Sequence, residues 1–357
     1  MNKCSCNEEP QGVKENSCCC SDEKTSCNCG RLQVASTRIS AMDLFGTCKA
    51  RLGIGRMDYK IEPGLYKVNN CDSTSPILVS ANYKLTFDTL RKNLADLDCW
   101  LLILDTKGIN VWCAAGKGTF GTEELINRIE KTGLAELVTH RKLILPQLGA
   151  SGVSAPEIFK RTGFSVMYGP VRATDIKAYI SAGMKATKEM RAVRFNLWDR
   201  FVLTPMELVE AAKIMLPVFG ALFIINLFTK RQFGIFDTVL YVGANFAGAF
   251  ITPILLPIIP GRAFSFKGWI VGLFWTAFAF WLFGWYERDF WLLVAGYGFL
   301  LPAVSSFLAM NFTGASTYTS PSGVLKEMKI ALPFIIGFSL IGVVLILIKS
   351  FMGLEVL

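Results

Sequence analysis

The chain has 357 residues, of which 52% are hydrophobic and only 18% are charged, with a formal net charge of +9. Because soluble domains carry about 25% charged residues, this composition excludes a disordered chain and argues against a fully soluble one. The basic excess is concentrated in residues 30–207, whose net charge is +8. Much of it precedes the first long apolar run, which favours inside-facing charges of a membrane protein over a nucleic-acid-binding surface.

The first thirty residues are dominated by cysteine. They are polar and contain no apolar stretch typical of a secretory signal peptide. We therefore expect residues 1–30 to be a flexible tail on the cytoplasmic side, where thiols stay reduced. Seven of the eleven cysteines lie in it: Cys4, Cys6, Cys18, Cys19, Cys20, Cys27 and Cys29.

Residues 45–183 are expected to form one domain, and within it residues 75–182 alternate between short apolar runs and segments of helical period. This alternation predicts an α/β domain, Rossmann-like, with a parallel sheet and helices on both faces. Ser154 and Glu157 predict a capping box, and Thr122 predicts another helix start. Gly133 and Gly163 predict helix ends. The expected strands are Ile77–Ser80, Trp100–Leu104, Leu143–Leu145 and Phe164–Tyr168, and the expected helices lie near 87–97, 122–132, 155–162 and 174–182.

The loops that follow the four predicted strands are rich in glycine and small residues. They comprise residues 81–85, 105–121, 146–151 and 169–172. In parallel sheets, ligands bind outside the carboxyl ends of the strands, so this edge is the predicted ligand site.

Two common nucleotide-binding motifs occur here only in incomplete form. A phosphate loop needs glycine at position 111 and serine or threonine at position 118, but this chain has Val111 and Gly118 there. Gly116, Gly118 and Gly121 have dinucleotide-fingerprint spacing. The direct strand-to-helix turn of that fingerprint is replaced by a long loop, so a nicotinamide or flavin site is disfavoured.

After a basic linker at residues 184–207, residues 208–350 contain apolar stretches of spanning length. No stretch carries a central charge, so we expect an anchor rather than a transporter. The basic residues place the N-terminal domain in the cytoplasm and the C-terminus outside the cytoplasmic membrane. The five expected transmembrane helices, which form an all-α domain in contact with lipid, cover about 211–229, 237–259, 268–286, 290–311 and 330–348.

The segment Asn110-Val-Trp-Cys-Ala-Ala-Gly-Lys117 resembles the signature of the mercury-methylating corrinoid protein family (HgcA). Residues 81–85, 145–150 and 168–173 agree with it, as do the five spans. The soluble part is also similar to the corrinoid-binding domain of the corrinoid iron–sulfur protein of the acetyl-CoA pathway.

This resemblance implies a corrinoid, a cobalamin-type cobamide, held at the carboxyl edge of the sheet. It implies that residues 110–117 form a short cap helix under the corrin ring, with the Cys113 thiolate as lower axial ligand of cobalt. A thiolate is a soft donor that suits such a metal. The implied cofactor-binding residues are Asn110, Val111, Trp112, Cys113, Ala114, Ala115, Gly116, Lys117, Gly149, Ala150, Ser151, Gly152, Tyr168, Gly169, Pro170, Val171 and Arg172.

The activity implied by the resemblance is a corrinoid-dependent methyltransferase that passes a cobalt-bound methyl group to Hg(II), giving methylmercury. The methyl group comes from a folate-linked donor. A 4Fe–4S ferredoxin-type partner (HgcB-like) re-reduces the cofactor, since the chain has no cysteine run for a cluster. The cysteine-rich tail either captures Hg(II) or another soft metal, or has no catalytic role. Two alternatives stay open: a membrane-bound methyl carrier in one-carbon metabolism, and a metal-binding transport protein.

Overall fold

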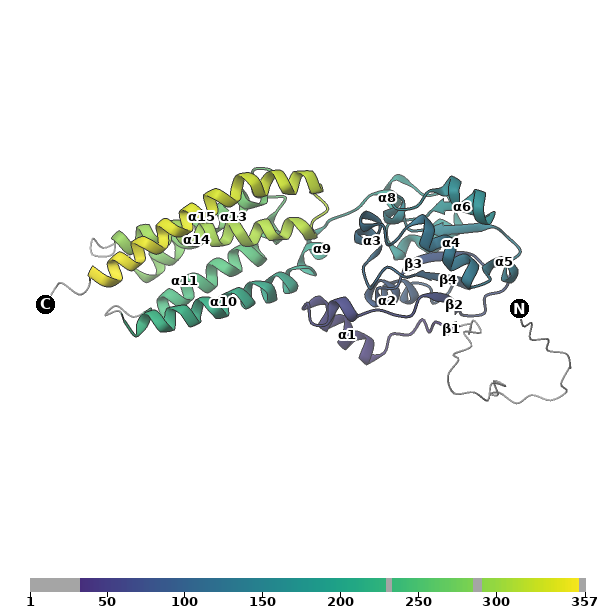
Figure 1. The fold of residues 1–357 in the computed structure, drawn as a ribbon, viewed down its shortest axis with the longest axis horizontal. Helices are drawn as coiled ribbons and strands as arrows, with labels where there is room; N and C mark the ends of the chain where they lie inside the picture. The colour runs from purple at the N-terminus through teal and green to yellow at the C-terminus, as the bar shows by residue number, and fades with distance from the viewer. Residues whose placement is uncertain (1–32, 229–232, 285–290, 353–357) are drawn as a thin grey trace, which may run out of the picture.

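The computed structural model describes residues 33–228, 233–284 and 291–352, in an N-terminal α/β part and a C-terminal helical bundle (Figure 1). The predicted cysteine-rich tail, residues 1–30, lies outside the described residues.

The α/β part is built on one six-stranded sheet in the order β1-β2-β4-β3-β5-β6. Pairing is parallel throughout except between β2 and β4, which run antiparallel. The four predicted strands and their parallel arrangement are confirmed, whereas the prediction of a purely parallel sheet is wrong at β2, which sequence analysis missed together with β1. The strands are β1 Gln33–Val34, β2 Gly64–Val68, β3 Ile77–Ala81, β4 Cys99–Leu104, β5 Lys142–Leu145 and β6 Ser165–Tyr168.

Helices cover both faces of the sheet, as predicted. α4 and α6 pack on one face and α2 and α7 on the other, each with its own buried apolar cluster. The helices of this part are α1 Ala41–Arg51, α2 Lys84–Lys92, α3 Val111–Lys117, α4 Thr122–Lys131, α5 Leu134–Leu137, α6 Ala155–Thr162, α7 Ile176–Ser181 and α8 Lys188–Arg191, with short 3-10 turns at η1 Arg56–Asp58, η2 Gln147–Gly149 and η3 Ala173–Asp175.

The helix predicted near 87–97 is shifted: α2 begins at Lys84 and ends at Lys92. The shift has a physical cause, because the Asn69 amide donates hydrogen bonds to the carbonyl oxygens of Leu94, Ala95 and Leu97. These carbonyls belong to a turn rather than to a helix ladder.

Of the two predicted helix starts in this part, one is confirmed in its position. Ser154 is the N-cap residue of α6, but its side chain makes no capping hydrogen bond, so the predicted capping box does not form. The N-cap of α4 is Gly121 rather than the predicted Thr122. The Thr122 hydroxyl oxygen instead accepts a hydrogen bond of 2.9 Å from the Ser154 backbone N–H, which ties the starts of α4 and α6 together. The predicted helix ends are confirmed, since Gly133 and Gly163 adopt left-handed φ values of 59° and 74°.

The bundle contains five helices that are long and apolar enough to cross a membrane, within the residues described. Each overlaps one predicted span, although α10 and α15 begin earlier than predicted, at Thr204 and Pro321. The elements are α9 Leu197–Phe201, α10 Thr204–Asn226, α11 Ile235–Phe246 continued by the π-helical turn η4 Ala247–Ile251 and by α12 Thr252–Leu255, α13 Phe264–Phe283, α14 Trp291–Asn311, η6 Phe312–Ala315 and α15 Pro321–Met352.

Small residues allow the bundle helices to approach closely. A Cβ atom at Gly248 would lie 2.5 Å from the Ser305 carbonyl oxygen on α14. Asp237, at the start of α11, is buried and accepts a hydrogen bond of 2.5 Å from the Tyr297 hydroxyl. This carboxylate therefore has a structural role in joining α11 to α14.

Candidate ligand-binding site

An apolar groove of about 320 Å³ lies over β3 and β5, between α2 and α7. These two strands are neighbours, but the connections that leave them cross opposite faces of the sheet, through α2 and α6 respectively. Such a reversal opens a crevice at the carboxyl ends of the strands. The groove is therefore at the edge where the sequence predicted a ligand.

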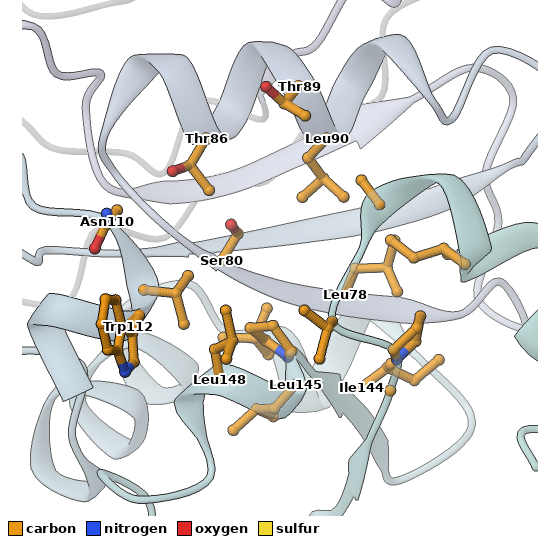
Figure 2. Close-up of a pocket in the computed structure, with 18 of the residues that line it drawn as sticks. Leu78, Ser80, Thr86, Thr89, Leu90, Asn110, Trp112, Ile144, Leu145 and Leu148 are labelled. Carbon is orange, nitrogen blue, oxygen red and sulfur yellow. The ribbon is translucent and has the colours of Figure 1, made fainter. Parts of the chain in front are cut away.

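The walls of the groove carry few polar groups. Figure 2 shows Leu78 and Ile144 on the sheet side, with Ser80 rising from β3 toward Thr86 of α2. Ser80 is only 3% exposed and is a polar residue in the otherwise largely apolar lining of the groove. A hydroxyl both donates and accepts hydrogen bonds, so Ser80 offers a ligand in the groove one polar contact.

The segment 110–117 does form a short helix, α3, beside the groove. The Asn110 side-chain oxygen caps its first turn by accepting a hydrogen bond of 2.9 Å from the Cys113 N–H, and Gly118 ends it with φ 80°. Asn110, Val111 and Trp112 line the groove. α3 therefore begins at the rim of the groove.

The two sides of α3 differ in burial. Val111, Ala114 and Ala115 are buried against the sheet. The other side exposes Trp112, Cys113, Gly116 and Lys117. Since positions three and four apart lie on one helix face, the Cys113 thiol stands next to Gly116, where an added Cβ would meet nothing within 4 Å. The result is a thiol beside a flat, open surface.

We expect Asn110→Ala to destabilise α3 by about 1 kcal/mol, the usual cost of losing an N-cap side chain. Amide hydrogen exchange at Cys113 should accelerate, because its N–H loses the 2.9 Å partner. Asn110→Asp is the matched control, since a carboxylate oxygen caps equally well. Unchanged exchange in Asn110→Ala would contradict the assigned cap.

Gly149 and Gly152, which the resemblance assigned to the cofactor, lie behind α3 and do not line the groove. An added Cβ at Gly149 would lie 2.5 Å from Cε1 of Phe120, and one at Gly152 only 2.2 Å from the Phe120 carbonyl oxygen. These glycines let the loop pack directly against the turn that follows α3. Between them, Ala150 is half-buried and Ser151 is exposed.

The residues of segment 168–172 have different roles. Gly169, Pro170 and Val171 line the groove. The Tyr168 hydroxyl instead donates a hydrogen bond of 3.0 Å to the Val153 carbonyl oxygen. The Arg172 guanidinium turns toward the bundle, where it pairs with the Asp199 carboxylate of α9 at 2.6 Å.

The glycines with dinucleotide-fingerprint spacing have turn functions. Gly118 is the left-handed end of α3, and an added Cβ at Gly121 would lie 2.7 Å from the Gly118 carbonyl oxygen. They form the tight connection from α3 to α4. This agrees with the sequence argument against a dinucleotide site.

Among the described cysteines, Cys113 is the exposed thiol at the groove edge. Cys71 and Cys99 are buried, and burial raises the pKa of Cys99 to about 12, so this thiol stays protonated. Cys48 is exposed on α1. No group of three or more metal-ligating side chains occurs within residues 33–228, 233–284 and 291–352.

Sequence analysis missed the polar residues inside the groove, Ser80 and Thr86. Ser80 ends an otherwise apolar predicted strand, and a hydroxyl at that position is the only signal that could have singled it out. Thr86 lies with Leu85, Thr89 and Leu90 along the α2 side of the groove. With the start of α2 predicted too late, Leu85 and Thr86 fell outside the expected helix.

Residues 55–180, which contain α3 and all the residues that line the groove, match the family described as CO dehydrogenase/acetyl-CoA synthase delta subunit (CdhD). The chain is 34% identical over 127 residues to the gamma subunit of the acetyl-CoA decarbonylase/synthase complex from Methanopyrus kandleri, covering 35% of this chain and 27% of that protein. The corresponding subunit from Methanocaldococcus jannaschii is 37% identical over 116 residues, covering 32% and 23%.

The aligned segment thus spans about a quarter of the length of these relatives. It leaves α1 and the bundle outside the matched residues 55–180. The part of the chain that builds the groove is therefore similar to a subunit of the acetyl-CoA decarbonylase/synthase complex, in agreement with the similarity to the acetyl-CoA pathway protein expected from the sequence.

Proposed function

We propose that this chain is a membrane-anchored corrinoid protein that passes a methyl group from cobalt to Hg(II), with Cys113 as the thiolate on the lower side of the ring. The observation that carries the proposal is the exposed Cys113 thiol on α3, at the carboxyl edge of the sheet and next to the groove.

The residues present fit a corrinoid. A thiol is a soft donor suited to cobalt, and the bare surface at Gly116 lets a flat ring approach the helix. The groove offers apolar walls and the Ser80 hydroxyl for a further part of the ligand. When bound, the corrinoid supplies a cobalt centre that accepts a methyl group and releases it to an electrophile such as Hg(II).

The chain itself positions and shields this centre. Asn110 fixes the first turn of α3, and Ala114 and Ala115 seat the helix on the sheet, so the direction of Cys113 is set before the ligand binds. Trp112, 39% exposed, lines the rim of the groove, where it would limit the access of water to a bound ligand. A ligand held by such a preorganised shell loses little freedom on binding.

We further propose that the five apolar helices span the cytoplasmic membrane, with the α/β part in the cytoplasm and the C-terminus outside. Helix length and hydropathy support this placement, as does the positive linker that leads into α10. A ferredoxin-type reductant and a folate-linked methyl donor would then meet the groove from the cytoplasm. Capture of Hg(II) by the cysteines of the tail is part of the same proposal.

A second candidate function is a methyl carrier in one-carbon metabolism. It is favoured by one observation, that the relatives of residues 55–180 are subunits of an acetyl-CoA decarbonylase/synthase complex. Both functions use the same cofactor and the same Cys113, so the methyl acceptor distinguishes them.

The test uses the full chain purified in detergent and reconstituted with a corrinoid. We expect stoichiometric cobalt, a visible corrinoid spectrum, and methylmercury from a single turnover of the methylated protein with Hg(II)–thiol complexes. Bound, methylated cofactor without methylmercury would overturn the mercury function and favour the second candidate. No bound cobalt would overturn both.

A further inference from the structure

The helix α1 presents an apolar face away from the protein. Phe45, Cys48 and Leu52 follow one another at helical spacing on this face, and Met42 and Leu44 flank it. Phe45 is 62% exposed and Met42 77%. A surface helix normally turns this side toward the core, so the face is expected to have a partner.

The opposite side of α1 is fixed to the α/β part by a cluster of buried and half-buried charges. The Asp43 carboxylate pairs with Lys84 at 2.5 Å and with Arg91 at 2.7 Å, both on α2. Asp88 completes the cluster by pairing with the same two cations. Ala50 is 1% exposed on this side. α1 is therefore held with its apolar face outward and cannot turn it inward without breaking these pairs.

The hydrogen bond from Lys84, with others from Ser40 and Arg91, outweighs burial and holds the pKa of Asp43 well below its usual range. The stabilisation from this lowered pKa is present above the pKa of a free carboxyl, about 4, and is lost as pH falls below it. The attachment of α1 is therefore complete at neutral pH.

The segment after α1 contacts the beginning of α10, the first helix long enough to span a membrane. The Arg56 guanidinium lies 2.7 Å from the Met206 sulfur, and a Cβ at Gly53 would lie 3.7 Å from the same side chain. Figure 1 shows α1 beside this end of the bundle. α9, at the same end, exposes 66% of Trp198, as expected for a residue at the level of lipid headgroups.

Basic residues accompany the apolar face. Lys49 and Arg51 lie in the last turn of α1, and Arg56 and Lys60 follow within nine residues. Among the described residues, none of these four cations makes an ion pair within 4 Å. Arg51 and Arg56 are half-buried and line a cavity with Tyr83 and Met206, whereas Lys49 and Lys60 are exposed. An apolar face beside exposed lysines is complementary to the boundary between acyl chains and anionic headgroups of a bilayer.

We propose that α1 lies on the cytoplasmic surface of the membrane, with Phe45, Cys48 and Leu52 in the lipid interface and Lys49 toward phospholipid phosphates. The proposal rests on the membrane placement of the bundle proposed above. It has a consequence for the site: α1 is ion-paired to α2, and α2 forms one wall of the groove, so lipid contact holds the groove at a fixed height above the membrane.

The test places the photoreactive residue p-benzoylphenylalanine at one of three phenylalanines of comparable exposure in the full chain. Phe45 is 62% exposed, Phe159 on α6 is 60% exposed, and Phe274 on α13 is 73% exposed. Each variant is reconstituted into vesicles of phosphatidylcholine and phosphatidylglycerol at 3:1, irradiated, and analysed for lipid adducts by mass spectrometry.

We expect lipid adducts at positions 274 and 45, and at least tenfold fewer at 159. Adducts at 274 but not at 45 would overturn the proposal for α1 while leaving the bundle in the membrane. A crosslink from position 45 to residues 1–32 or to a second chain would overturn it in favour of that partner. Absence of adducts at 274 would instead overturn the membrane placement itself.

Discussion

Cys113→Ala is expected to lower methyl transfer to Hg(II) by about 100-fold, at the upper end of the effects seen when groups around a metal ligand are removed. The proposed thiolate is the soft donor of the site, and alanine offers the metal nothing in its place. Because Cys113 is exposed and makes no core contact, we expect the free energy of unfolding to change by less than about 0.5 kcal/mol.

Cys48→Ala is the matched control, since Cys48 is also an exposed thiol but lies on α1. It should leave the rate of methyl transfer unchanged. The visible spectrum separates a direct role from an indirect one: loss of a thiolate ligand changes the absorption of the bound corrinoid, whereas a purely structural cysteine would not. Cys113→Ala protein with full activity and an identical spectrum would remove Cys113 from the proposed site.

The strands that the sequence predicted well are fully buried, so their residues form a continuous apolar run. β3 and β4 are buried at every position. Their sequences are therefore almost entirely apolar and indicate a strand without any alternation of polar and apolar residues. The sequence did not predict β2 because Lys67 interrupts its apolar pattern and because its first residue is Gly64. Its antiparallel pairing with β4 depends on a contact between segments more than thirty residues apart, which no local pattern encodes.

The candidate site was predicted in outline but not in its details. The carboxyl edge follows from parallel strands alone, and the cap helix follows from the resemblance of residues 110–117. The assignment of Gly149 and Gly152 to the cofactor followed from the resemblance and stays a prediction. Glycine permits close approach by any group, and here that group is Phe120 of the protein itself.

Gly152→Ala is expected to have the largest effect on stability. The new Cβ would meet two backbone atoms, the Phe120 carbonyl oxygen at 2.2 Å and the Ala115 Cα at 3.1 Å. Backbone cannot move aside as a flexible side chain can, so the cost should reach about 3 kcal/mol, the upper range for overpacking. This corresponds to a fall of roughly 6–10 °C in the melting temperature of the α/β part, measured by circular dichroism.

Gly116→Ala is the counterpart on the other side of the same helix, where the added Cβ meets nothing. In the absence of cofactor it should stabilise α3 by about 0.5 kcal/mol, because alanine favours helix over glycine. If a flat ring lies against this surface, the same methyl group should weaken corrinoid binding roughly tenfold, equivalent to about 1.4 kcal/mol. For Gly116→Ala, higher stability with unchanged corrinoid affinity would place the ring elsewhere. For Gly152→Ala, a melting temperature equal to that of the wild type would contradict the packing of the 149–152 loop behind α3.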